Sequence, residues 1–205
     1  MLLSVHESVV WWLFQHNNST SQIAEEFANQ KTASDYVYGL FKDSDLDSEQ
    51  KGIESIQFKD TQYVSRVLNR ARGKIEDTLR NHAQTHRLDI ESVQDYKGLL
   101  IGFDYQASTP VYIVFTMKRG VVIWYKHDSY AGKLCDGTPF REPEDSQSDP
   151  CPKKGECREV LDTIIEEYDI ELRPDERDLY MTKQSIAIFN KLAAKEIPRY
   201  KRGGN

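Results

Sequence analysis

The stretch FKDTQYVSRVLNRARGKIEDTLRNHAQTH, from Phe58 to His86, decides the fold of the first half of this chain. Apolar residues recur in it at steps of three and four, which places them on one face of a helix. They are Val64, Leu68, Ala71, Ile75 and Leu79. Asp60 or Thr61 can cap the start, because a short side-chain oxygen accepts from the free N–H groups of the first turn. The stretch is therefore predicted to form one long amphipathic helix.

The polar faces of this helix are basic, although the protein as a whole is acidic. Residues 58–87 hold seven Lys or Arg and three acids, a local charge of +4, whereas the chain of 205 residues has a net charge of −6. A basic helix on an acidic chain favours a localised surface for a polyanion. A solvated amphipathic helix is the alternative interpretation.

The order of residues from Thr61 to Ile75, TQYVSRVLNRARGKI, resembles the recognition helix of helix-turn-helix regulators, most of all the final helix of sigma-factor region 4. The wider arrangement resembles small winged-helix regulators of prokaryotes, archaea or viruses. The resemblance implies that early polar positions contact base edges and later basic positions lie near phosphates. The implied DNA-binding residues are Thr61, Gln62, Ser65, Arg66, Asn69, Arg70, Arg72 and Lys74.

The segments before this helix fit the same resemblance, with one departure. Residues 5–16 form a strongly apolar helix, and Ser19 or Thr20 can cap a short amphipathic helix that resembles the first helix of a helix-turn-helix. The departure is an acidic segment, 28–57, which we interpret as an insertion, since its charge would repel phosphates. A second placement stays open, in which residues 32–41 are themselves the second helix of the unit.

In the second half of the chain, the residue pattern changes from one typical of helices to one typical of strands. Residues 97–106, 111–117 and 121–127 are rich in β-branched and aromatic side chains, and turn sequences separate them. They predict a three-stranded antiparallel meander. Residues 156–168 and 182–197 then predict two amphipathic helices, with a connector over 169–178.

Three cysteines fall between the last predicted strand and the next helix. Cys135, Cys151 and Cys157, with His127 as fourth ligand, predict a structural zinc site, because zinc prefers four N/S ligands. A Cys151–Cys157 disulfide, free thiols and an iron–sulfur cluster are the alternatives. His82 and His86 lie four residues apart and can also share a metal, although an exposed pair explains them as well.

The sequence therefore predicts an α+β protein in two parts. Residues 1–95 form a helix-turn-helix part and residues 96–205 a meander, a zinc-stapled loop and two C-terminal helices. The predicted function is a sequence-specific DNA-binding transcriptional regulator, a homodimer in the cytoplasm with no membrane span and no enzymatic activity. The alternatives are a protein–protein adaptor that uses the basic helix and the helix with Trp11 and Trp12, and a metal-dependent enzyme acting on nucleic acid.

Overall fold

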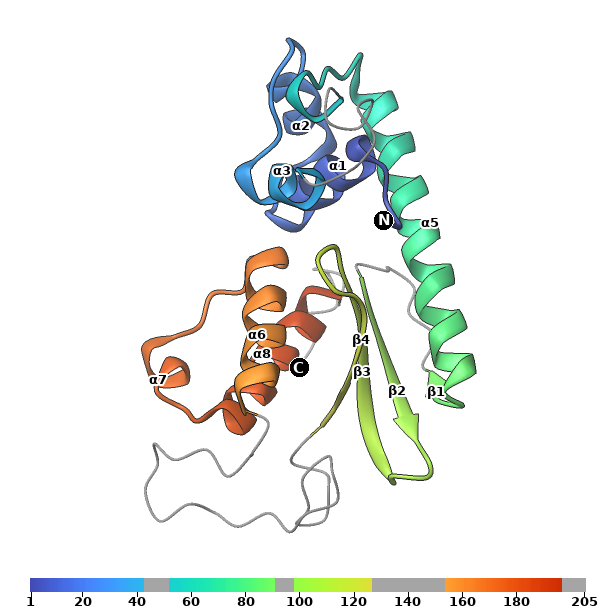
Figure 1. Cartoon of the computed structure of the whole chain (residues 1–205), viewed down its shortest axis with the longest axis vertical. Coiled ribbons are helices and arrows are strands. Elements are labelled where there is room, and N and C mark those ends of the chain that lie inside the picture. The colour runs from blue at the N-terminus through green and yellow to red at the C-terminus, as the bar shows by residue number, and fades with distance from the viewer. Residues whose placement is uncertain (43–51, 91–97, 127–153, 197–205) are drawn as a thin grey trace, which may run out of the picture. The chain divides into compact units, whose positions relative to one another are not determined.

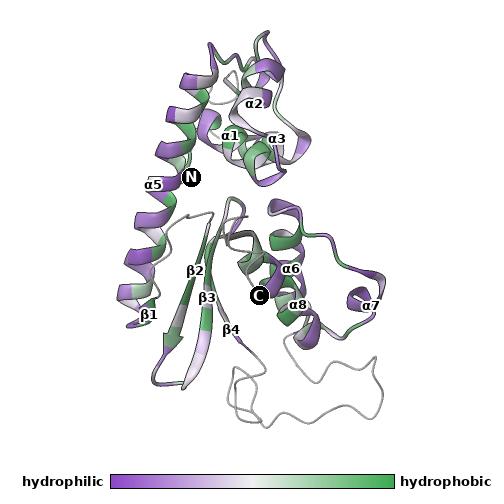
Figure 2. Ribbon diagram, turned by 180° about the vertical axis from the view of Figure 1, so that it is seen from behind, coloured by the Kyte–Doolittle hydropathy of each residue, from purple (hydrophilic) through white to green (hydrophobic). Residues whose placement is uncertain are grey.

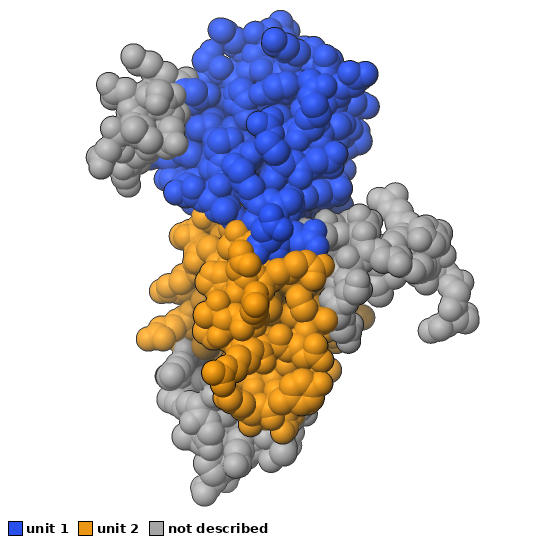
Figure 3. Space-filling view, turned by 90° about the vertical axis from the view of Figure 1, so that its right-hand side faces the viewer, with its two compact units in different colours: residues 1–77 blue, residues 78–205 orange. Residues whose placement is uncertain are grey.

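The computed structural model describes residues 1–42, 52–90, 98–126 and 154–196. The chain divides into two compact units, Met1–Asp77 (unit 1) and Thr78–Asn205 (unit 2), shown in Figure 3. The α+β class is confirmed, because unit 1 is helical and unit 2 contains an antiparallel sheet with helices. Within the described ranges, the search for an apolar helix of membrane-spanning length finds none. The boundary predicted near residue 95 lies outside the described residues.

Unit 1 packs α1 (Val5–Gln15), α2 (Thr20–Glu26) and α3 (Asp35–Phe41) beside the first turns of α5 (Thr61–Thr85), as Figure 1 shows. Ser4 and Glu7 form a capping box at the start of α1. Ser19 caps α2, as predicted, and accepts from the backbone N–H of Gln22. The buried side of α1 includes Trp11, whereas Trp12 is only half-buried.

The long helix α5 is confirmed. Asp60 Oδ1 accepts a hydrogen bond from the backbone N–H of Tyr63 at 2.6 Å, which is the predicted cap. All five residues predicted for its apolar face are buried, and Val67 and Ala83 join them. In Figure 2 the first turns of α5 are apolar toward α1 and hydrophilic on the other side.

Backbone hydrogen bonds bring together the two ends of the segment between α2 and α5. The backbone N–H of Phe58 donates to the carbonyl of Phe27 at 2.9 Å. Lys31 and Ile56 form an antiparallel bridge, and the N–H of Ala33 donates to the carbonyl of Ile53 at 3.1 Å. The end of α2 and the start of α5 are therefore neighbours, although the segment between them contains α3.

The sheet of unit 2 has four strands in the order β1-β2-β3-β4 rather than the predicted three, so that prediction is corrected. β2 (Leu99–Asp104), β3 (Thr109–Thr116) and β4 (Gly120–Tyr125) are the three that the sequence indicated. β1 (Asp89–Ile90) adds to the edge beside β2. A strand of two residues has no room for an alternating pattern, which is why the sequence does not reveal it.

Helices α6 (Lys154–Glu167) and α8 (Met181–Glu196) pack on the sheet. The Phe189 ring stacks on Tyr112 with centroids 4.6 Å apart. Tyr168, at the end of α6, donates from its hydroxyl to the carbonyl of Phe115 at 2.6 Å. The predicted connector 169–178 contains a further short helix, α7 (Pro174–Arg177), which is a second correction.

Candidate nucleic-acid interface

The first four turns of α5 carry an exposed face opposite their buried face. Its members recur at helical spacing, and all are exposed. They are Gln62, Arg66, Asn69, Arg70 and Gly73, and we call this set the open face. Four of these five residues belong to the DNA-binding set that the sequence implied, so the helix brings half of that set onto one surface.

The open face carries two cations, Arg66 and Arg70, and Arg70 lines the same cavity as Glu7. Within the described part of the chain, the guanidinium groups of Arg66 and Arg70 form no ion pair or hydrogen bond. The same holds for the ammonium group of Lys59, which precedes the helix and which the sequence argument did not select. Their charges are therefore available to an anionic partner.

Lys74 differs from these cations, because its charge is already balanced. Its Nζ lies 2.7 Å from Oε2 of Glu7, a residue of α1 that is only 3% exposed. Burial would raise the pKa of the Glu7 carboxyl, but hydrogen bonds from Lys74 and from the Ser4 backbone outweigh it, and the pKa lies below its ordinary value. Lys74 thus joins α5 to α1, and its predicted phosphate contact stays a prediction.

Two further residues of the implied set also contact their own unit. The guanidinium carbon of Arg72 lies 4.6 Å from the centre of the Phe14 ring, a cation–π contact between α5 and α1. The Ser65 hydroxyl donates to the backbone carbonyl of Thr61 at 2.9 Å. The sequence could not separate Arg72 from the cations of the open face, because its contact with Phe14 depends on tertiary packing.

An aromatic cluster holds the start of α5 in place. His6 Nδ1 and the Tyr63 hydroxyl oxygen lie 2.8 Å apart, and the Phe58 ring contacts both side chains. Burial lowers the pKa of His6 below its ordinary value of 6.5, which favours the neutral ring. A cavity of about 290 Å³ beside this pair is also lined by Arg70. Sequence reasoning missed His6 and Tyr63, since 57 positions separate them.

The predicted zinc site falls mostly outside the described residues. His127, Cys135 and Cys151 lie there, and only Cys157 is described, half-buried in α6. Among the described residues there is no group of three or more His, Cys, Asp or Glu that could hold a metal ion. His82 and His86 are both exposed, with ring centroids 6.4 Å apart. Zinc binding stays a prediction.

The tryptophan pair invoked for an adaptor does not form one surface. Trp11 is 1% exposed and belongs to the core. The Trp12 ring stacks on Tyr36 with centroids 4.4 Å apart. Of these two tryptophans, only Trp12 is therefore accessible to a partner protein.

Comparisons of the chain with protein-family models, curated proteins and solved structures find no match.

Proposed function

We propose that the protein is a sequence-specific DNA-binding regulator of transcription that reads duplex DNA with the open face of α5. The observation that carries the proposal is that guanidinium groups, which form no ion pair with any described residue, alternate with side-chain amides on one exposed helix face. Arg66 has the donor pair that recognises guanine, and Gln62 and Asn69 have the donor–acceptor pair that recognises adenine. Arg70 and Lys59 supply charge for phosphates.

The anchoring of α5 supports this assignment, because base reading requires a helix that is held rigidly. The cap at Asp60, the buried face and the ion pair between Lys74 and Glu7 all fix its first turns. The hydrogen bond from Phe58 to Phe27 places the end of α2 beside the start of α5. That adjacency is what a helix-turn-helix needs, and it favours the interpretation of residues 28–57 as an insertion.

A single helix contacts only a few base pairs, so we propose that two copies bind together as a homodimer on a two-part site. In this proposal the protein is cytoplasmic and not an enzyme, and zinc at His127, Cys135, Cys151 and Cys157 has a structural role.

The test begins with selection of bound duplexes from a random pool. Arg66→Ala and Asn69→Ala should each weaken binding to the selected duplex about tenfold or more, and binding to random DNA much less. Arg70→Ala should weaken both and flatten the dependence of log K on log salt by about one unit. Lys118→Ala, which removes an exposed charge from unit 2, is the control and should change neither.

Two results would refute the proposal at different levels. Equal losses on both DNAs for Arg66→Ala and Asn69→Ala would exclude base reading by α5. Absence of DNA binding by the intact protein at low salt would exclude DNA as the partner.

A further inference from the structure

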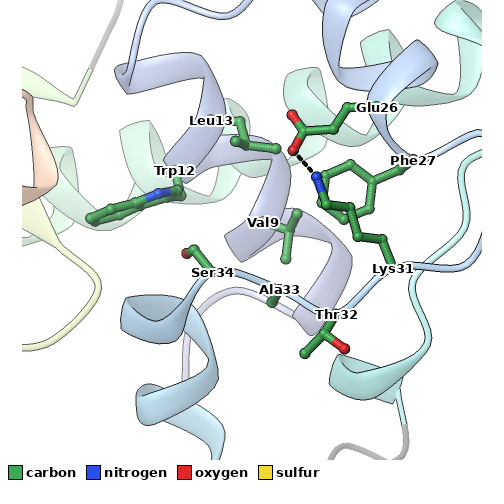
Figure 4. Close-up of a pocket in the computed structure, with 9 residues that line it drawn as sticks. All are labelled: Val9, Trp12, Leu13, Glu26, Phe27, Lys31, Thr32, Ala33 and Ser34. Atoms are coloured by element: carbon green, nitrogen blue, oxygen red, sulfur yellow. Dashed lines mark hydrogen bonds and ion pairs between the residues drawn. The ribbon is translucent and has the colours of Figure 1, made fainter.

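A small cavity of about 200 Å³ lies within unit 1, bounded by α1, the end of α2 and residues 31–34 (Figure 4). Most of its wall is apolar. Val9 and Leu13 come from α1, Phe27 follows α2, and Ala33 precedes α3. Val9, Phe27 and Ala33 are buried, whereas Glu26, Lys31, Thr32 and Ser34 are exposed, so the cavity adjoins the core and is open to solvent.

Two charges stand at the edge of the cavity, and they neutralise each other. Glu26 and Lys31 form an ion pair, drawn as the dashed line in Figure 4. The Lys31 ammonium also lies 5.5 Å from the centre of the Phe27 ring. A ligand that entered would therefore meet paired charges and apolar walls, which disfavours a charged group inside.

The Ser34 hydroxyl is a polar group in the wall that can donate a hydrogen bond to a ligand. Ser34 Oγ accepts from the backbone N–H of Val37 at 3.5 Å, and its own O–H donates to no described residue. The neighbouring hydroxyl of Thr32 already donates to the carbonyl of Glu54 at 3.1 Å. The cavity thus offers apolar contact and one donor at its margin.

We propose that this cavity is a binding site for a neutral compound with a single ring and at most one hydrogen-bond acceptor. An apolar cavity of about 150 Å³ is sufficient for benzene, so about 200 Å³ accommodates one ring with a small substituent. Binding is driven by contact of the ring with Val9, Leu13 and Phe27, and the Ser34 hydroxyl orients an acceptor. The proposal goes beyond DNA binding and does not depend on it.

The test uses toluene, phenol and benzoate as probes of the full-length protein. Their addition is followed by the NMR signals of the methyl groups of Val9 and Leu13. Toluene and phenol should shift these signals to saturation, whereas benzoate should bind at least about tenfold more weakly, because its carboxylate would lose its hydration. Failure of both neutral probes to give saturating shifts, or equal affinity for benzoate, would overturn the proposal.

A substitution that fills the cavity gives the second arm. Ala33→Leu should weaken toluene binding about tenfold or more, since even one methylene too many in an apolar site costs about that factor. Ala28→Leu makes the same change at an exposed position outside the cavity and should leave binding unaltered. Equal affinity in both variants would place the probe elsewhere and overturn the site.

Enlargement of the cavity keeps the test decisive if Ala33→Leu does not fold. Leu13→Ala removes part of one wall, and the variant should bind naphthalene more tightly than the native protein does. Naphthalene binding that is the same in native protein and in Leu13→Ala would contradict the proposed boundaries.

Discussion

Glu7 in unit 1 and Glu167 in unit 2 are both buried, and their carboxylates are stabilised in different ways. In unit 1, Glu7 pairs with the ammonium group of Lys74, a side chain of α5. In unit 2, Glu167, 1% exposed, accepts from the backbone N–H groups of Met117 and Lys118 at 2.6 and 3.0 Å. Its carboxylate therefore fastens the end of α6 to the turn between β3 and β4.

The difference matters for the assignment of function. Backbone N–H groups bind the Glu167 carboxylate, whereas Glu176, also buried in unit 2, pairs with Arg173 and Lys191 much as Glu7 pairs with Lys74. In unit 1 the buried acid engages one of the cations that the sequence had implied for DNA. A basic residue on a helix is thus evidence of a polyanion site only when packing leaves its charge unpaired, as the described residues do for Arg66 and Arg70.

The largest expected effect concerns Glu167. Glu167→Ala should destabilise unit 2 by about 3 kcal/mol, because two backbone N–H groups lose a charged acceptor in a buried place. Urea unfolding followed by amide signals of β3 and β4 measures this. Glu159→Ala, on the same helix, removes a 73% exposed carboxylate that pairs with Arg119, and should cost less than about 1 kcal/mol. Equal costs would mean that Glu167 is held by packing rather than by its carboxylate.

The next effect concerns Lys74. Lys74→Met should destabilise unit 1 by about 1–2 kcal/mol at neutral pH, because it leaves the Glu7 carboxylate buried without its cation; partial exposure of Lys74 reduces the cost. Because the pKa of Glu7 is lowered in the folded protein, the stability from the pair is present at neutral pH. That stability is lost as the pH falls through the folded pKa, below the ordinary value of 4.5.

The cost of Lys74→Met should therefore shrink on acidification, which unfolding curves at pH 7 and below pH 4.5 can show. Glu7→Gln combined with Lys74→Met should recover part of the stability, since no buried charge remains. If Lys74→Met left stability intact and flattened the salt dependence of DNA binding by about one unit, Lys74 would belong with Arg70 as a phosphate contact.

Much of the fold was predictable, because the sequence patterns that specify its elements lie within short segments. The apolar spacing from Val64 to Leu79 and the turn sequences between β2, β3 and β4 each determine structure within a few residues. The two-residue strand β1 and the one-turn helix α7 are too short to produce a periodic pattern. Glu167 was missed for another reason: its partners are backbone groups about 50 positions away, and no residue type marks them.

The candidate site was only half predictable, for a physical reason. The helical period indicates which residues share a face, and it correctly groups Gln62, Arg66, Asn69 and Arg70. It does not indicate which neighbouring face packs against α1. The contacts of Arg72 with Phe14 and of Lys74 with Glu7 join residues more than 50 positions apart. Charge counting along the sequence treats all these cations alike, whereas contacts among the described residues engage Arg72 and Lys74 but not Arg66 or Arg70.

The smallest expected effect concerns Gly73, the member of the open face without a side chain. Glycine inside a helix costs about 1 kcal/mol relative to alanine, and a Cβ added at Gly73 would meet no atom within 4 Å. Gly73→Ala should therefore stabilise unit 1 by about 0.5–1 kcal/mol in urea unfolding. Gly39→Ala in α3, where a Cβ also meets nothing, is the matched control and should stabilise similarly. Packing within the described residues does not require glycine at position 73. A side chain added there should therefore affect binding only of a partner that approaches the open face closely. Gly73→Ala should then weaken binding to the selected duplex while Gly39→Ala leaves it unchanged; equal DNA affinities would show that the partner does not reach the fourth turn of α5.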